Sequence, residues 1–245
     1  MLRNVLRSYC YKNKELFYTR RSGSNHLYLY DNSILKEFDT SVPNYKSEYN
    51  ILDKISHKNI ININDAFYEK NNFYTVMPYY RKGDLWQEMN DKKFTDFLTI
   101  AIKLVKPITY IHKNNLVHLD IKPENYVIDD SNNYILIDFE HARNHNDEYY
   151  QLNKIDLPIG TDKYMAPEIR SLQFGPTSDV YSLGRTLYAI IARRHADSSE
   201  IDWLPIKKNA PELENIIVAM LQPNHLLRPT IFEIYREISL LLYKR

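Results

Sequence analysis

Alternating hydrophobic and polar positions in the first third of the chain predict five short β-strands. These runs are rich in aromatic and β-branched residues, and turn-forming residues separate them. Between the third and fourth runs, Tyr45–Ile55 has its apolar residues at helical spacing instead. A small β-rich unit with one helix is therefore expected at this end of the chain. The predicted strands are Glu15–Tyr18, His26–Tyr30, Ser33–Phe38, Ala66–Tyr68 and Phe73–Met77.

Helical periodicity dominates the rest of the chain. The longest such pattern, Thr95–His112, places its apolar residues on one face, and Pro107 inside it is expected to kink the helix or shift its end. Trp203 and Leu204 are expected to pack in the core or between helices. Further predicted elements are the amphipathic helices Glu212–Leu221 and Ile231–Tyr243 and the strand Tyr126–Ile128.

Composition limits the class of protein. With 245 residues, of which 44% are hydrophobic, the chain suits one large domain or one two-lobed unit with a buried core. The net charge of +1 provides no basic field for nucleic acid. No apolar run approaches the roughly 20 residues that span a bilayer, so no membrane association is expected. The lone Cys10 excludes an internal disulfide, and the polar stretch Met1–Lys14 is no secretory signal, so we expect a cytoplasmic protein.

The most informative stretch is Asp120–Asn125, which contains an acid, a lysine and an amide within six residues. The Asp120 carboxylate is suited to accept a proton from a hydroxyl, Lys122 to neutralise a phosphate, and Asn125 to hold a metal ion. Phosphoryl transfer needs these groups because its catalysis consists mainly of positioning and charge neutralisation. The alternative is a polar loop between a helix and a strand, with no chemical role.

The same stretch resembles the catalytic loop of protein kinases, H-R-D-L-x-x-x-N. His118, Asp120 and Asn125 fill the matching places, Leu119 replaces the arginine, and Lys122 stands where serine/threonine kinases keep a lysine. The resemblance extends over nearly the whole chain and implies the eukaryotic-type serine/threonine protein kinase family. It implies one domain with the two-lobed α+β kinase fold: a β-rich N-lobe (1–77), a hinge (78–80) and a mainly helical C-lobe (81–245).

In the N-lobe, the resemblance assigns the nucleotide phosphates to Lys36, which ends a segment similar to the kinase V-A-I-K strand. Glu48 starts a segment similar to the kinase C-helix, and a Lys36–Glu48 pair is expected to hold the lysine in place. The Gly-rich loop keeps only its middle glycine, Gly23. The alternatives are a solvated strand lysine and an ordinary hairpin turn.

The resemblance also outlines a purine pocket. Met77 is expected to gate its back, the Pro78 carbonyl and the Tyr80 N–H to bind adenine, and Asp84 to meet the ribose. Asp84 as a plain helix N-cap is an equally open alternative. In a separate departure from the family, Tyr28 and Ile34 are expected to crowd the purine because the family usually has smaller residues at both positions.

Magnesium, or manganese, is expected between Asn125 and Asp138, because Ile135–Glu140 resembles the D-F-G strand and turn and hard oxygen ligands suit such ions. A turn aspartate without metal is the alternative for Asp138. Glu140 replaces the family's glycine. Two hypotheses follow: Phe139 is less free to flip, and a third acid alters the metal preference.

The segment Gly160–Glu168 resembles the kinase G-T-x-x-Y-x-A-P-E stretch, which implies that Thr161 bonds near Asp120 and that Glu168 pairs with Arg228. Asp179, in a stretch similar to D-V-W-S-L-G, is expected to open a buried helix to Ile191 and to bond the catalytic-loop backbone. A simple N-cap role is compatible with this.

The resulting prediction is an ATP- and magnesium-dependent kinase that phosphorylates serine or threonine on proteins. A pseudokinase, which binds partners but lacks efficient catalysis, and a small-molecule kinase remain alternatives. Asp84 and Glu124 indicate a preference for basic peptides. Leu119 cannot bind a phosphorylated loop as arginine does, so activity is expected without phosphorylation of Tyr149 or Tyr150. Oligomeric state is not defined by the sequence.

Overall fold

The structure, a computed structural model, divides into two compact units, Met1–Arg81 and Lys82–Arg245. The residues described are 15–18 (backbone only), 25–30, 32–41, 43–91, 94–145, 162–171, 173–195 and 201–245.

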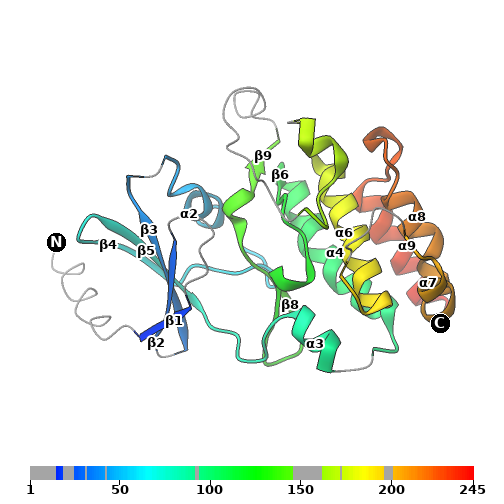
Figure 1. The fold of residues 1–245 in the computed structure, drawn as a ribbon, viewed down its shortest axis with the longest axis horizontal. Helices are drawn as coiled ribbons and strands as arrows, with labels where there is room; N and C mark the ends of the chain where they lie inside the picture. Colours follow the sequence, from blue (N-terminus) through cyan, green and yellow to red (C-terminus); the bar gives the residue numbers. More distant parts are fainter. Residues whose placement is uncertain are drawn as a thin grey trace. The chain divides into compact units, whose positions relative to one another are not determined.

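A five-stranded antiparallel sheet with the order β1-β2-β3-β5-β4 forms the first unit (Figure 1). All five predicted strands are present. The helix is shorter than predicted, because α2 covers Ser47–Leu52 and the chain turns at Asp53 and Lys54. The strands are β1 (Glu15–Tyr18), β2 (His26–Tyr30), β3 (Ser33–Asp39), β4 (Asp65–Glu69) and β5 (Asn72–Pro78).

The strand register determines which side chains share a face of this sheet. Lys36 lies opposite Thr75 of β5 and Leu27 of β2. Directly opposed residues of antiparallel strands point to the same face, and successive residues alternate between faces. One face therefore carries Lys36 and its partners, and α2 covers it, since Glu48 reaches Lys36.

The opposite face of the sheet has its own apolar cluster. Tyr28 and Tyr30 of β2 pack on it, while its four members are almost completely buried, with 0–5% of their surface exposed. Because both faces of the sheet are packed, β3 and β5 have buried apolar residues on each face, such as Leu35 and Phe38 in β3. The cluster consists of Leu35, Phe67, Tyr74 and Val76.

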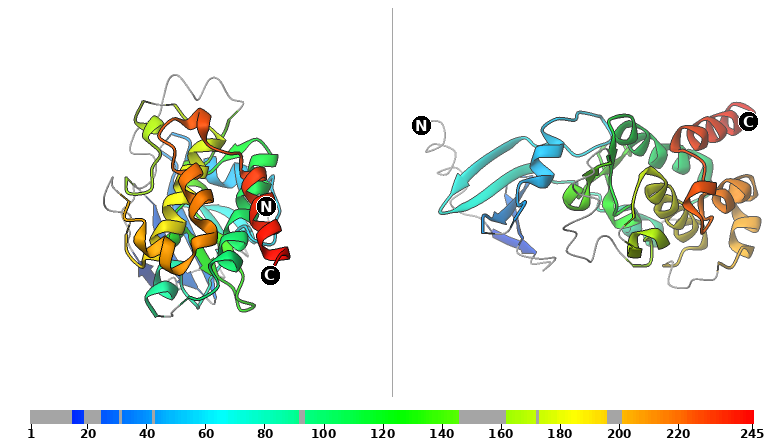
Figure 2. Two further views of the ribbon diagram at one scale, coloured as in Figure 1. Left: turned by 90° about the vertical axis from the view of Figure 1, so that its right-hand side faces the viewer. Right: turned by 90° about the horizontal axis from the view of Figure 1, so that it is seen from above.

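Helices form most of the second unit. Figures 1 and 2 show α9 alongside α4, with α6 and α8 next to them. Helix α4 begins after Asp96, whose side chain caps the Thr99 N–H at 3.2 Å, and continues through Pro107 to Lys113, so Pro107 does not move its end. The helices are α3 (Leu85–Asp91), α4 (Phe97–Lys113), α6 (Pro176–Ala192), α7 (Leu204–Asn209), α8 (Glu214–Met220) and α9 (Ile231–Tyr243).

Two small sheets in this unit frame the segment with the candidate chemistry. Strands β6 (Leu116–Val117) and β9 (Arg143–Asn144) form one, and β7 (Tyr126–Ile128) and β8 (Tyr134–Leu136) form the other. The loop between β6 and β7 contains His118 to Asn125. Short 3-10 turns cover Pro123–Asn125, Phe139–His141, Pro167–Ser171, Pro211–Leu213 and His225–Leu227.

Two predictions for this unit were wrong in detail. Leu204 is 68% exposed, because it is the first residue of α7 and that helix turns Ile206 to the core instead. The predicted helix Glu212–Leu221 is split into a 3-10 turn and α8. Within the described residues, no helix is long and apolar enough to cross a membrane.

Candidate active site

The loop between β6 and β7 brings the three predicted polar residues together. One oxygen of Asp120, Oδ2, accepts hydrogen bonds from Lys122 Nζ at 2.6 Å and from Asn125 Nδ2 at 2.9 Å. Asn125 Nδ2 also donates to the Asp120 carbonyl at 2.8 Å. All three residues are buried, with 4–7% of their surface exposed, so contacts with neighbouring groups fix their geometry.

The buried carboxylate of Asp179 holds the backbone of this loop. It accepts the N–H groups of His118 and Leu119 at 2.8 Å each, which confirms the predicted contact. Since α6 starts at Pro176 with Gly175 as its N-cap, Asp179 lies within the first turn and is not the cap. His112 adds a third bond to Asp179 at 2.9 Å. Burial alone raises the pKa of Asp179, but the bonds from His112 and His118 outweigh it and leave that pKa lowered.

His118 is neutral, and its ring supports the catalytic loop through two hydrogen bonds. Burial lowers its pKa, against the opposing pull of Asp179, Asp120 and Asp138. Its Nδ1 accepts the Asp120 N–H at 3.3 Å, and its Nε2 lies 3.1 Å from the Ile137 carbonyl. The neutral ring with hydrogen on Nε2 satisfies both contacts, so one side chain links the loop to the strand end that precedes Asp138.

Both predicted metal ligands lie at the ends of the β7–β8 pair. The Ile137 N–H donates to the Asn125 carbonyl at 3.0 Å, and Asp138 is the next residue. Because Asn125 uses its amide nitrogen on Asp120, its amide oxygen points away and accepts no hydrogen bond from the described residues. An amide oxygen and a carboxylate fit magnesium, which commonly takes one or two protein oxygens beside phosphate and water.

The backbone of the turn after β8 does not require a glycine at position 140. Asp138 has the left-handed backbone (φ 65°), whereas Glu140 lies in the 3-10 turn Phe139–His141. Glu140 therefore has a backbone that any residue adopts. Phe139 is fully buried with its edge on the His118 ring, 4.7 Å between centroids. The two Glu140 hypotheses remain predictions.

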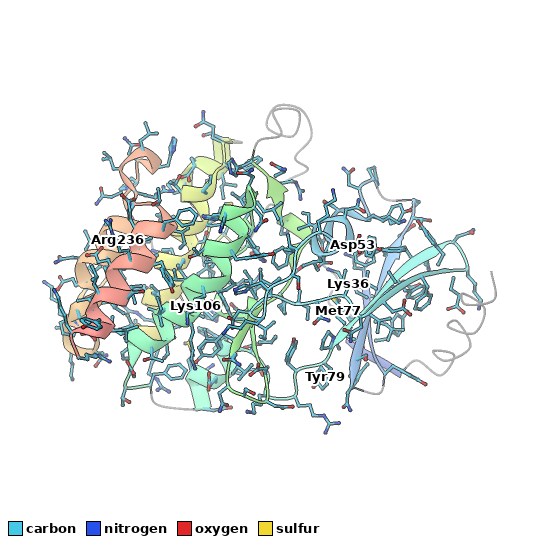
Figure 3. The ribbon with its side chains drawn as sticks, turned by 180° about the vertical axis from the view of Figure 1, so that it is seen from behind. Lys36, Asp53, Met77, Tyr79, Lys106 and Arg236 are labelled. Carbon is cyan, nitrogen blue, oxygen red and sulfur yellow. The ribbon has the colours of Figure 1, made fainter. Side chains whose placement is uncertain are left out.

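In the first unit, the predicted Lys36–Glu48 contact is confirmed. Lys36 Nζ donates to Glu48 Oε2 at 2.7 Å, and the two residues are 7% and 4% exposed. Figure 3 labels Lys36 on β3 and Met77 on the neighbouring β5. Ile34 lies opposite Met77, on the same face as Lys36. The buried contact between Lys36 and Glu48 excludes the alternative of a solvated strand lysine.

Tyr28 does not lie where it was expected. Its register partner is Leu35, and its hydroxyl donates to Glu37 at 2.5 Å, both on the face away from Lys36. Burial and the Glu37 carboxylate raise the pKa of Tyr28 to about 12. The prediction that Tyr28 crowds a purine on the Lys36 face is therefore wrong. Leu29, the partner of Ile34, occupies that face instead.

The remaining predicted pocket residues lie near the junction of the two units in the sequence. Pro78 ends β5, and Tyr80 follows two residues later. Asp84 Oδ1 accepts the Gln87 N–H at 2.9 Å, so Asp84 does cap α3 as in the simpler alternative. Gly83, before it, has φ +77°, a left-handed backbone conformation that strains any residue with a Cβ and therefore favours glycine. The predicted Gly23, Thr161, Tyr149 and Tyr150 fall outside the described residues.

The predicted Glu168–Arg228 pair is confirmed as a bidentate contact, with distances of 2.7 and 2.9 Å. Ser178 adds a bond to Glu168 at 2.7 Å. Burial raises the pKa of Glu168, but these bonds outweigh it and leave the pKa below its usual value. The pair ties the 3-10 turn Pro167–Ser171 to the segment before α9.

Leu119 has a structural role that its sequence position did not reveal. It is 2% exposed and packs with Val117, Ala166 and Ile169. Its backbone is left-handed (φ 66°), a strained conformation for leucine that the Asp179 bond and this packing hold in place. The catalytic loop therefore contacts the segment that ends in Glu168 through apolar packing.

Sequence reasoning missed His112 and Ser178. Both lie in helices whose other residues read as core, and neither has a local motif that predicts its partner. His112 has one available signal, because it closes a helix six residues before His118 and can reach back toward the loop.

Comparison with known proteins defines the class. Residues 30–238 match the family described as Protein kinase domain, and the chain therefore belongs to that family. The fold agrees, with a β-sheet unit followed by a mainly helical one. The relatives below are named as serine/threonine kinases or as myosin light chain kinases, which identifies the chain as a member of the eukaryotic-type serine/threonine protein kinase family.

Myosin light chain kinase 3 of Rattus norvegicus is 32% identical over 155 residues, which are 60% of this chain and 19% of that protein. A protein of Acanthamoeba polyphaga mimivirus with the name "Putative serine/threonine-protein kinase" is 31% identical over 211 residues, 76% of this chain and 75% of its own. Serine/threonine-protein kinase TIO of Arabidopsis thaliana is 33% identical over 156 residues, 62% and 12% respectively. The chain thus spans about a fifth of the length of the rat relative.

Proposed function

We propose that the chain is an active, ATP- and magnesium-dependent kinase that transfers the γ-phosphate of ATP to serine or threonine of a protein. The observation that carries this proposal is the buried set of Asp120, Lys122 and Asn125 around one carboxylate oxygen. Asp179 holds the backbone of this loop by accepting the N–H groups of His118 and Leu119. A loop without chemistry gains nothing from burying these groups, since each must be paired to offset its desolvation.

The Asp120 carboxylate would orient the substrate hydroxyl and accept its proton. Lys122, which holds the same oxygen, would neutralise charge on the phosphoryl group during transfer. Both roles depend on positioning, because the transition state is loose and most of the catalysis is electrostatic.

Nucleotide and metal are assigned to two further sets of residues. Lys36, held by Glu48, would bind the nucleotide phosphates, with Gly23 covering them, Met77, Pro78 and Tyr80 at adenine and Asp84 at ribose. Asn125 and Asp138 would hold magnesium or manganese, which would supply positive charge to offset that of the phosphates. We also propose the single-domain division of 1–77, 78–80 and 81–245 for lobes and hinge.

The second candidate is a pseudokinase. The lone Gly23, Ile34 and Glu140 still favour it. Tyr28 no longer does, because its side chain lies on the face away from Lys36. The observation against it is that Lys36 and Glu48 form their predicted contact.

A protein substrate with basic residues near the phosphorylated hydroxyl is the proposed partner. The acid Glu124, one of whose side-chain oxygens accepts no hydrogen bond from the described residues, supports this preference. A peptide array that selects acidic residues would contradict this preference. A cytoplasmic location is a further proposal, supported by the lone cysteine among 245 residues.

Transfer of labelled γ-phosphate from magnesium ATP to a generic basic protein tests the function directly. Asp120→Asn is the inactive comparison, because it removes the proton acceptor and keeps the size. Asp130→Asn is the matched control, since Asp130 is an exposed acid on the turn between β7 and β8.

Label on serine and threonine in wild type and Asp130→Asn, with a loss of at least about a hundredfold in Asp120→Asn, is the expected result. Equal low labelling in all three proteins, with no thermal shift from magnesium ATP, would establish the pseudokinase instead.

A further inference from the structure

Helix α2 carries Glu48 but has little stability of its own. It has six residues, its N-cap residue Lys46 makes no side-chain capping bond, and no basic residue lies in its last turn. Isolated helices shorter than about 12 residues are marginal in water. The position of α2, and with it the position of Glu48, must therefore come from contacts with the sheet.

Lys46 provides such a contact at the start of the helix. Its ammonium lies 4.7 Å from the ring centroid of Tyr68 and 4.7 Å from that of Phe73. Both rings belong to the hairpin of β4 and β5. A cation within about 6 Å of a ring centroid is attracted by the negative face of the ring.

Other aromatic contacts complete this arrangement, which we call the Lys46 box: the Lys46 ammonium over Tyr68 and Phe73, with Tyr45 in contact with both rings. The hydroxyls of Tyr45 and Tyr68 are 2.9 Å apart. Phe73 is 3% exposed, and the rings of Tyr45 and Tyr68 pack against it with centroids 6.0 and 5.1 Å away. Phe73 therefore forms the buried side of the box, and Tyr68 forms a partly exposed side.

The electrostatics of the box agree with its geometry. The contact with Tyr68 raises the pKa of Lys46, and the Lys46 ammonium lowers that of Tyr68. The two shifts have opposite signs, as expected for one attractive contact between an ammonium and a phenol.

The box lies within one helical turn of Glu48, the residue that bonds Lys36. Lys46 directly precedes α2, and Glu48 is the second residue of the helix and bonds Lys36 at 2.7 Å. We propose that Lys46 is a positioning residue: its ammonium, held by Tyr68 and Phe73, fixes α2 on the β4–β5 hairpin and so keeps Glu48 on Lys36.

The catalytic part of this inference rests on the proposed function, but the placement of Glu48 does not. A readout without catalysis is therefore needed beside the activity. Acetylation of the Lys36 amine by acetic anhydride, followed by mass spectrometry, reports whether Lys36 is paired. A working Lys36–Glu48 contact protects the amine, and Glu48→Gln defines the unprotected level.

Lys46→Met removes the cation and keeps the chain length, while Lys46→Arg keeps a cation that also stacks on rings. Lys54→Met is the matched control, because Lys54 is an exposed lysine just beyond the other end of α2. Tyr68→Leu removes one wall of the box at a half-exposed position and tests the same idea without touching the lysine.

The expected result is increased Lys36 acetylation in Lys46→Met and Tyr68→Leu, toward the level of Glu48→Gln, with Lys46→Arg and Lys54→Met near wild type. For phosphate transfer, kcat/KM for ATP should fall about two- to tenfold in Lys46→Met and recover in Lys46→Arg. In a Glu48→Gln background, Lys46→Met should cause no further loss.

Lys36 acetylation at the wild-type level in both Lys46→Met and Tyr68→Leu would overturn the inference, as would an additive loss in the Glu48→Gln background. An inactive wild type would remove the proposed function alone, because the acetylation experiment would still decide the placement of Glu48.

Discussion

The carboxylate of Asp120 shows how much a single residue depends on its neighbours. Its Oδ2 accepts from Lys122 and Asn125, while its backbone N–H is held by His118. Asn125 also presents its amide oxygen away from Asp120. A change at Asn125 therefore disturbs both the proposed proton acceptor and the proposed metal site, and its effect cannot be divided between them.

Residues 28 and 34 allow a sharper test at this scale. Ile34 shares a face with Lys36, and Tyr28 lies on the other face with Glu37. Ile34→Ala should lower KM for ATP, because it removes bulk on the nucleotide side. Tyr28→Phe should leave that KM unchanged and cost about 1 kcal/mol of stability, from the lost bond to Glu37.

Steady-state kinetics over a range of ATP concentrations and urea unfolding measure the two effects. A lower KM in Tyr28→Phe would mean that this side chain reaches the nucleotide after all.

At the scale of elements, the segments around the catalytic loop are joined by a few buried contacts. The Glu168–Arg228 pair ties the turn Pro167–Ser171 to the segment before α9, and Leu119 packs the catalytic loop against the same turn. One contact is ionic and the other apolar, so they respond to different conditions.

The ionic contact makes the stability of the folded state depend on pH. The pKa of Glu168 is lowered in the folded state, so as pH falls below the unfolded value of about 4.3 the unfolded state binds the proton first. The contribution of Glu168 is complete above that pH and is lost as pH falls through the folded pKa. Urea unfolding from about pH 6 to pH 3 should show a shallower decline in Glu168→Gln, whose own stability is lower at pH 6. Parallel curves for both proteins would contradict this.

The apolar contact bears on regulation. Leu119 is buried where the family usually has arginine, so a phosphorylated loop finds no guanidinium there. Tyr149→Phe combined with Tyr150→Phe should retain at least about half of the phosphate-transfer activity, because Leu119 cannot bind a phosphate on these residues as arginine does. Activity measured on protein expressed without other kinases checks this. Abolished transfer would show that these tyrosines are required.

For the whole molecule, the proposed function predicts a change in stability when ligand binds. Lys36 and Glu48 belong to Met1–Arg81, while Asp120 and Asp138 belong to Lys82–Arg245. A ligand that binds the folded chain and not the unfolded one raises its thermal stability.

Magnesium ATP at about 100 times its Kd should stabilise the chain by about 2.7 kcal/mol, a rise in Tm of roughly 5–10 °C. Lys36→Met and Asp138→Asn should each abolish most of this rise, and chelation of magnesium should do the same to wild type. Lys54→Met and Asp130→Asn are the matched controls. A full shift in Asp138→Asn would remove that residue from the metal site.

Much of the fold could be predicted because its signals are local. Five strands, α4, α9 and the catalytic-loop stretch each depend on spacing within a short segment, and the family motifs made the Lys36–Glu48 and Glu168–Arg228 pairs predictable. The extent of α2 was less predictable, since a six-residue helix is held by the sheet rather than by its own periodicity.

By itself, the sequence determined the strand and helix periods, the chemistry available at Asp120–Asn125 and the family to which the chain belongs. Only the tertiary structure decided which face of the sheet carries Tyr28, that His112 bonds Asp179, and that the Lys46 ammonium lies over the rings of Tyr68 and Phe73. The reason is physical: a side chain's face depends on strand register, and its partner depends on segments far away in the chain, which no local pattern encodes.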